Sequence, residues 1–152
     1  MQKIIPNLWF NGNVREAVDF YVSVFPDGKI ISTEHYPEST EEGLADFQLH
    51  LAGDILTIEF EIFDTRFVAI NAGPEFAFSE SVSFSVPCKD QAEIDYYWAK
   101  LSAYPENEQC GWCKDKYGLS WQIVPENIDE LMKKPGAYRT MMEQHKIVIA
   151  EY

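Results

Sequence analysis

The chain has 152 residues and a formal net charge of −13, with 25 acidic and 12 basic side chains. That balance argues against binding to nucleic acid or to anionic membrane surfaces, because both depend on clustered Lys and Arg. We interpret the charge as an aid to solubility. The length suits one domain, 1–152, and a hydrophobic content of 46% argues against disorder.

The three cysteines, Cys88, Cys110 and Cys113, do not form the framework of a secreted disulfide-rich protein. The first residues lack the apolar run of a signal peptide, and no window reaches the length of a membrane span. We therefore expect a cytoplasmic protein without a membrane partner.

The first half of the chain predicts a strand, a helix and three further strands. Asn13 and Glu16 have the spacing of a capping box at the helix start. The polar segment 37–53 stays undecided, and we favour a short helix or an ordered loop over 44–51. The predicted elements are a strand over 4–10, a helix over 13–25, and strands over 29–36, 55–63 and 67–71.

The second half begins in the same way and ends with helices. Capping boxes are predicted at Asp90 and at Asn127, and Gly118 closes a turn with positive φ. The predicted elements are a strand over 81–86, a helix over 91–103, a hairpin over 108–125 with its turn at 114–118, helices over 128–134 and 136–144, and an extended end over 146–150.

An internal repeat relates the two halves, since a shift from Asn13 to Asp90 also places Glu16 on Glu93. Each half therefore predicts a βαβββ module. A helix covers one sheet face of such a module, so the free faces of two modules can enclose a cavity. The predicted fold class is α+β, with mixed sheets in module one (about 1–74) and module two (about 80–125) and a C-terminal helical extension, 126–152.

Four stretches carry a family resemblance: 20–25, 67–76, 93–98 and the motif over 109–125. They resemble the PhnB-like family, labelled 3-demethylubiquinone-9 3-methyltransferase, of the glyoxalase, bleomycin-resistance and extradiol dioxygenase (vicinal oxygen chelate) superfamily. The resemblance implies the two-module fold and a homodimer. The methyltransferase label fits poorly, because the glycine-rich turn that binds such a cofactor is replaced by the isolated Gly12.

Metal-dependent members of that superfamily hold the ion with His or Glu side chains from four strands. The resemblance places these positions near Pro6 or Asn7, near Asn71, near Ser81 or Ser83, and on Gln122. Amides and hydroxyls lack the charge that holds a divalent cation against water. We therefore expect no metal and no other cofactor, and keep a metal-dependent lyase, isomerase or dioxygenase as an alternative.

The same positions, with neighbouring aromatic residues, suit a small and partly apolar ligand held by neutral hydrogen bonds. The two tryptophans in this set are equally well explained as core or dimer contacts. Glu59 is the candidate catalytic acid or base if its strand face is buried, since burial raises a carboxyl pKa. The candidate ligand-binding residues are Asn7, Trp9, Glu59, Asn71, Ser83, Trp112 and Gln122.

Cys110 and Cys113 match a CxxC pattern, but they precede a turn and a strand. No helix start lowers their pKa, so we interpret them as structural. His35, His50 and His145 are scattered and form no predicted site. The sequence thus predicts a homodimer that binds a small organic molecule in a metal-free cavity. A sequestration protein of the antibiotic-resistance type is a further alternative.

Overall fold

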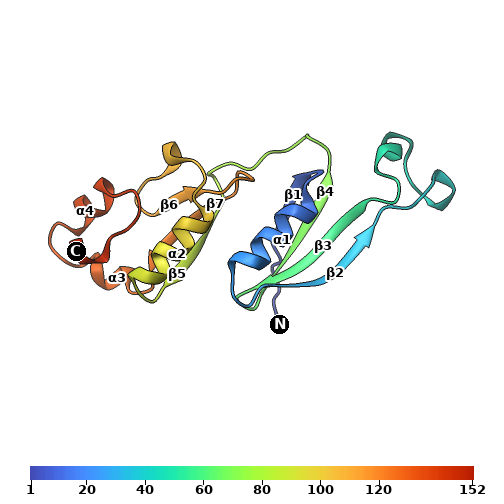
Figure 1. Cartoon of the computed structure of the whole chain (residues 1–152). Coiled ribbons are helices and arrows are strands. Elements are labelled where there is room, and N and C mark those ends of the chain that lie inside the picture. The colour runs from blue at the N-terminus through green and yellow to red at the C-terminus, as the bar shows by residue number, and fades with distance from the viewer. The chain divides into compact units, whose positions relative to one another are not determined.

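The computed structural model describes residues 1–152, which form two compact units, Met1–Ala77 and Phe78–Tyr152. Each unit is a mixed sheet with a helix along one face (Figure 1). The predicted α+β class with two mixed sheets is therefore confirmed. None of the helices combines the length and apolar character needed to cross a bilayer.

Unit 1 has a four-stranded sheet in the order β1-β4-β3-β2. β1 runs parallel to β4, and the other neighbours are antiparallel. All elements predicted for this half are present within a few residues of their expected bounds. They are β1 (Asn7–Asn11), α1 (Val14–Val24), β2 (Lys29–His35), β3 (Ile55–Ile62) and β4 (Thr65–Ala72).

The two faces of this sheet differ in chemistry. On the α1 side, Tyr21 stacks on Phe60 with 6.2 Å between ring centroids, and Phe60 stacks on Phe67 at 5.4 Å. Ile58, Phe60 and Ile62 are buried, whereas the alternate residues of β3 are only half-buried. The opposite face, called here the open face of unit 1, has no helix of this unit on it.

The undecided segment 37–53 contains two 3-10 helices, Thr40–Glu42 and Asp46–Leu51. Figure 1 shows this segment reaching past the ends of β2 and β3. The prediction of a short helix over 44–51 is therefore confirmed. Phe47 and Leu49 are exposed there, so their alternation does not mark a core strand.

Unit 2 repeats this arrangement with a three-stranded sheet in the order β5-β7-β6. β5 is parallel to β7, and β6 is antiparallel to it. The face under α2 buries Val86, Cys113 and Ile123; the other is the open face of unit 2. The elements are β5 (Ser83–Cys88), α2 (Gln91–Leu101), β6 (Trp112–Lys114) and β7 (Ser120–Pro125).

The prediction of a complete βαβββ second module is wrong by one strand. Residues 102–111 separate α2 from β6, and they hold a 3-10 helix, Pro105–Asn107, and a turn at Cys110–Gly111 with positive φ at both residues. This leaves no run long enough for a strand. A backbone hydrogen bond from Ala103 N to Lys114 O, 2.9 Å, marks the edge where the strand would lie.

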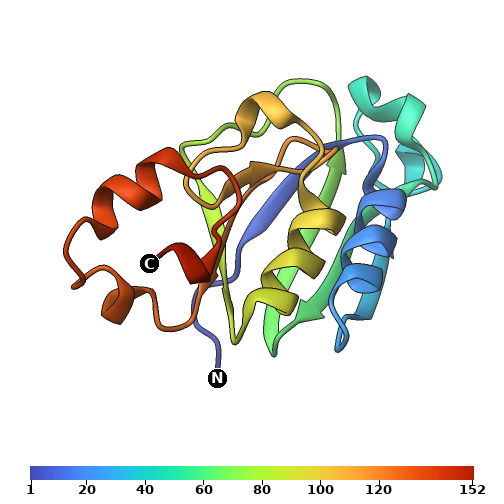
Figure 2. The ribbon, with the colours of Figure 1, turned by 60° about the vertical axis from the view of Figure 1, so that its left-hand side comes forward.

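The C-terminal extension packs on unit 2, where it can be followed in orange and red in Figure 2. Cys110 N and Gly111 N donate to Gln144 O and His145 O at 2.7 and 2.8 Å, and Ile147 is fully buried. The extended end predicted over 146–150 is wrong, because the chain bends there into a 3-10 turn. The extension contains α3 (Ile128–Leu131), α4 (Ala137–Glu143) and the 3-10 turn Ile149–Glu151.

Two of the predicted capping boxes are also wrong. Asn13 and Asn127 occupy N-cap positions, but neither side chain makes a capping hydrogen bond. Their ψ angles are 24° and 25°, whereas Asp90 has an extended backbone with ψ 176° and its carboxylate accepts from Glu93 N. A cap side chain reaches the first-turn amides from such an extended N-cap residue.

Candidate functional site

The open face of unit 2 brings three predicted site residues together. Gln122 Nε2 donates a hydrogen bond to Ser83 Oγ at 2.9 Å. Trp112 is the direct neighbour of Gln122 across the β6–β7 pair, so its indole belongs to the same face. Ser83, Gln122 and Trp112 therefore lie side by side, and ligand binding by them stays a prediction.

Sequence reasoning misses a fourth member of this cluster, Ser120. It is the register partner of Ser83 on one side and of Lys114 on the other. The residue is 1% exposed, and its hydroxyl has no hydrogen-bond partner. A buried hydroxyl without a hydrogen-bond partner lowers the free energy of unfolding by about 1–3 kcal/mol. The alternation that places Ser120 and Gln122 on one strand face was the available signal.

An ion pair borders the cluster. Lys114 Nζ bonds to the carboxylate of Glu80, and this hydrogen bond holds the pKa of Glu80 below its usual value. The lysine charge is therefore already neutralised by a carboxylate of the same unit. The remaining polar groups of the cluster, Ser83, Ser120 and Gln122, are uncharged, which favours a neutral ligand.

The β6–β7 turn fixes the register of this site. Asp115 is fully buried, and its Oδ1 accepts from Tyr117 N at 2.9 Å and from Leu119 N at 3.1 Å. Gly118 has φ +91°, the positive value expected from the sequence. The turn is therefore built around an internal acceptor, and the register that pairs Trp112 with Gln122 follows from it.

The open face of unit 1 carries Asn7, Trp9 and Glu59. Asn7 and Glu59 flank Val68 in the register of β1, β4 and β3. Trp9 Nε1 donates to Gly73 O at 2.9 Å, so the indole N–H is already used and the ring remains as an apolar surface. These three predicted residues share one sheet face, as their alternation with buried neighbours indicated.

Glu59 does not match the buried carboxyl that the acid–base hypothesis assumed. Its Oε1 lies 2.8 Å from Arg66 Nε, and its side chain is 28% exposed. An ion-paired carboxylate open to water is better explained as part of the charge pattern of this face. Arg66, the partner, was not among the predicted site residues.

Asn71 is a correction to the predicted set. It is 3% exposed and lies on the α1 side of the sheet, alternating with the open-face residue Ile70. Its Oδ1 accepts from Gly12 N at 3.0 Å and its Nδ2 donates to Ile55 O at 2.8 Å. The amide is therefore occupied in holding the chain together, and we remove it from the ligand-binding candidates.

The positions implied for metal ligands do not fit a divalent cation. On the open faces, β1 and β4 offer Asn7 and Ile70, and β5 and β7 offer Ser83 and Gln122. No charged oxygen or imidazole is among them, so the donor set lacks what such an ion requires. No group of three or more His, Cys, Asp or Glu side chains in residues 1–152 is placed to hold a metal.

The cysteines are not activated. Burial raises the pKa of Cys88 and of Cys113 to about 12, and the pKa of the Cys113 thiol is raised further by the charges of Asp115 and Glu108. Burial also raises the pKa of Cys110. Because the thiolate is the reactive form, the raised pKa values favour the structural interpretation of the CxxC pattern, which stays a prediction.

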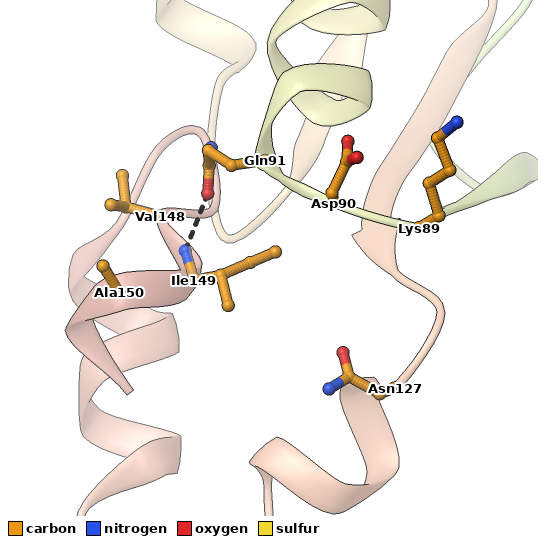
Figure 3. A pocket seen from close by; sticks show the side chains of 7 residues that line it. All are labelled: Lys89, Asp90, Gln91, Asn127, Val148, Ile149 and Ala150. Carbon is orange, nitrogen blue, oxygen red and sulfur yellow. Dashed lines mark hydrogen bonds between the residues drawn. The ribbon is translucent and has the colours of Figure 1, made fainter.

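A separate pocket of about 450 Å³ lies between the start of α2 and the end of the chain (Figure 3). Lys89, Asp90 and Gln91 line one side, Asn127 another, and residues 148–150 supply an apolar wall. Gln91 Oε1 accepts from Ile149 N at 2.8 Å, so this glutamine anchors the extension. None of the predicted site residues lines this pocket.

Paired units of this kind, each with a helix on one sheet face and polar and aromatic side chains on the other, define the glyoxalase and bleomycin-resistance class of proteins. Within that class, the chain belongs to the family described as 3-demethylubiquinone-9 3-methyltransferase, whose model matches residues 2–124. The extension over 126–152 lies outside this match. No curated protein matches the chain.

Solved structures agree with this assignment. The chain is 31% identical to the PhnB protein from Bacillus cereus, with a TM-score of 0.63 over 82% of this chain and 99% of that one. Protein PA1353 from Pseudomonas aeruginosa is 21% identical, with a TM-score of 0.57 over 83% and 98%. The fosfomycin resistance protein FosX from Mesorhizobium loti is 15% identical, with a TM-score of 0.50 over 88% and 100%. The last two similarities concern the fold alone.

Proposed function

We propose that this protein binds a small, neutral organic molecule on the open face of unit 2, without a metal ion. The observation that carries the proposal is the buried hydroxyl of Ser120, which has no partner beside the Gln122–Ser83 pair. Buried polar groups are nearly always hydrogen-bonded, so a ligand that reaches this hydroxyl and supplies the missing partner would explain its unpaired state.

The surroundings of Ser120 support a neutral and partly apolar ligand. Trp112 offers an aromatic surface next to Gln122, and such surfaces bind apolar rings while neighbouring amides fix orientation. Trp9 and Asn7 on the open face of unit 1 supply the same chemistry. Methyl transfer is not part of the proposal, because the turn between β1 and α1 consists of Gly12 and Asn13 and is not glycine-rich.

A homodimer and a cytoplasmic location complete the proposal. Each sheet leaves one face without a helix of its own unit, and such faces are the usual surfaces for association. All three cysteines are free thiols, as expected in a reducing compartment. Sedimentation of the purified protein measures the first point, and a monomer at all concentrations would contradict it.

A thermal-shift screen tests the binding function. A ligand that binds only the native state raises the melting temperature, and we expect the hits to be neutral molecules. Replacement of Gln122 by Leu should lower the affinity of each hit by about tenfold, since a hydrogen bond contributes about 1.5 kcal/mol. An unchanged affinity in this variant would contradict the site.

Glu59→Gln tests whether the open face of unit 1 takes part in binding, and Glu16→Gln is its control. Glu16 is an exposed residue in the first turn of α1, so its replacement makes the same chemical change away from both open faces. We expect neither variant to alter the affinity of a neutral hit at unit 2. A loss confined to Glu59→Gln would return that carboxylate to the candidate site.

A further inference from the structure

The hydrogen-bonding capacity left over on the open face of unit 2 narrows the class of ligand. Gln122 uses Nε2 on Ser83 Oγ, so its Oε1 remains available as an acceptor. Ser83 accepts that bond, so its own hydroxyl proton is available for donation. The hydroxyl of Ser120 has no partner. The cluster therefore offers two donors and one strong acceptor, all uncharged.

These groups converge on a small area. Ser83 and Ser120 are direct neighbours on adjacent strands, which lie about 4.8 Å apart. Gln122 is two residues beyond Ser120, yet its amide reaches back diagonally to Ser83. The amide is therefore drawn toward the row that holds both hydroxyls. Because Ser120 is 1% exposed, one functional group meets all three side chains by taking the place of the groups that cover Ser120.

We propose that this cluster recognises the edge of a planar neutral amide, a ring or side group in which a carbonyl oxygen lies beside an N–H. The inference rests on the proposed function and names its ligand class. The carbonyl oxygen accepts from the hydroxyls of Ser120 and Ser83, and the N–H donates to Gln122 Oε1. The plane of the amide lies against Trp112, the cross-strand neighbour of Gln122.

Other ligand classes match the cluster less well. A carboxylate would place an oxygen without a proton against Gln122 Oε1, and Lys114 is already paired with Glu80. An ammonium ion has no acceptor for the hydroxyl protons of Ser83 and Ser120. A carbonyl without a neighbouring N–H leaves the glutamine oxygen unpaired, which costs free energy once water is excluded.

The test uses 2-pyridone, which has the carbonyl and the N–H, together with N-methyl-2-pyridone, which lacks the N–H, and benzoate as an anionic control. Binding is followed on the full-length protein by the NMR signals of the Gln122 side-chain amide and by tryptophan fluorescence. We expect 2-pyridone to bind about tenfold more tightly than its N-methyl form, the equivalent of one hydrogen bond. Benzoate should not shift the Gln122 signals.

Two variants separate recognition from folding. Gln122→Leu should abolish the preference for 2-pyridone over its N-methyl form, because the acceptor for the N–H is gone. Ser120→Ala should weaken both probes to a similar extent without lowering the melting temperature, since an unpaired buried hydroxyl does not stabilise the free protein. Ser39→Ala, at a residue whose side chain caps nothing in unit 1, should change neither quantity.

The outcomes distinguish the two proposals. Equal binding of the two pyridones overturns the amide inference and leaves the binding function standing. The same holds if neither binds while the affinity of another screened ligand depends on Gln122. If no molecule in the screen raises the melting temperature and no probe shifts the Gln122 signals, both proposals fail. A fall in melting temperature in Ser120→Ala would mean that the hydroxyl serves the fold.

Discussion

The indole nitrogen of Trp121 donates a hydrogen bond to the carboxylate of Asp115 at 2.8 Å, inside a turn where the aspartate is fully buried. Two backbone amides of the turn, Tyr117 N and Leu119 N, donate to the other oxygen of the same carboxylate. One side chain thereby joins the end of β6, the turn and the start of β7. Loss of that carboxylate leaves three donors without an acceptor, two of them buried.

Replacement of Asp115 by Ala should therefore be among the most damaging single changes in unit 2. We expect a loss of about 3 kcal/mol in the free energy of unfolding, the range seen when one member of a buried polar network is removed. Urea denaturation followed by tryptophan fluorescence measures this. The stability of Asp115→Asn should lie between that of the unmodified protein and that of Asp115→Ala, because the amide oxygen of asparagine keeps part of the acceptor capacity.

Asp129→Ala is the matched control. Asp129 is an exposed residue of α3, and surface changes of this kind stay within about 0.5 kcal/mol. If Asp115→Ala were no more destabilising than Asp129→Ala, the carboxylate would not hold the turn together.

A second prediction concerns Asn71, which ties the turn after β1 to the start of β3. Asn71→Ala leaves Gly12 N and the carbonyl of Ile55 without their partners, both in a part-buried setting. The expected cost is about 2–3 kcal/mol, from one unsatisfied donor and one unsatisfied acceptor. The midpoint of urea denaturation reports it.

Asn13→Ala provides the comparison within the same unit. The Asn13 side chain makes no capping hydrogen bond, so its removal should cost far less than the 1 kcal/mol or so of a functioning cap. A loss at Asn13 comparable to that at Asn71 would show that the capping box does form in solution.

Alternating apolar residues made most of the fold predictable, because each strand buries one face under a helix. Ile58, Phe60 and Ile62 carry that signal, and they are buried as the pattern required. The missing strand of unit 2 was not predictable from the repeat. The turn at Cys110 and the 3-10 helix at Pro105 occupy the connection between α2 and β6, so no strand forms there. Turns and short 3-10 helices have no periodic pattern in the sequence that would predict them.

The candidate site, like the fold, was predictable from the sequence only in part. Ser83 and Gln122 were found because the family resemblance places ligand positions there, and the structure joins the two side chains by a hydrogen bond. Asn71 was misassigned, because a resemblance fixes a position only approximately and a shift of one residue moves a side chain to the other face. Ser120 was missed because a buried orphan hydroxyl becomes visible only when every hydrogen bond is assigned.

A third prediction follows from the buried thiol of Cys113, whose pKa rises from 9.0 to about 12. Between pH 9 and pH 12 the thiol ionises in the unfolded chain but keeps its proton in the fold. The unfolded state then binds fewer protons, so the free energy of unfolding falls as pH rises. The slope is about 1.4 kcal/mol per pH unit for each such thiol, and the contribution is intact below pH 9.

Denaturation curves between pH 8 and pH 11 measure this slope. In Cys113→Ala the free energy of unfolding should fall less steeply with pH than in the unmodified chain, by about 1.4 kcal/mol per pH unit. Cys110→Ala should change this slope less, because Cys110 is only half-buried. Tyr36, whose pKa is also raised by burial, is present in all these proteins and cancels from the comparison. Identical slopes in the two variants would show that Cys113 ionises freely in the fold.

The last prediction tests how the C-terminal extension is held on unit 2. Gly111 has φ +88°, and a methyl group there would lie 3.0 Å from Ile123 O and 3.1 Å from Ile147 Cδ1. Gly111→Ala therefore combines a left-handed backbone, at about 1–2 kcal/mol, with a clash against the fully buried Ile147.

Gly12→Ala isolates the first of these two effects. Gly12 has φ +83° but no atom within 4 Å of a new methyl group, so only backbone strain is added. Gly111→Ala should exceed it by about 1–2 kcal/mol, the usual cost of overpacking. It should also speed proteolysis within 145–152, because this segment contributes no strand to the sheet and displacement of Ile147 loosens it. The two variants could instead lose equal free energy of unfolding and show equal resistance to proteolysis in the extension. Ile147 would then move aside without cost, and the extension would be held by its hydrogen bonds to Gln91 and to the turn at Cys110–Gly111.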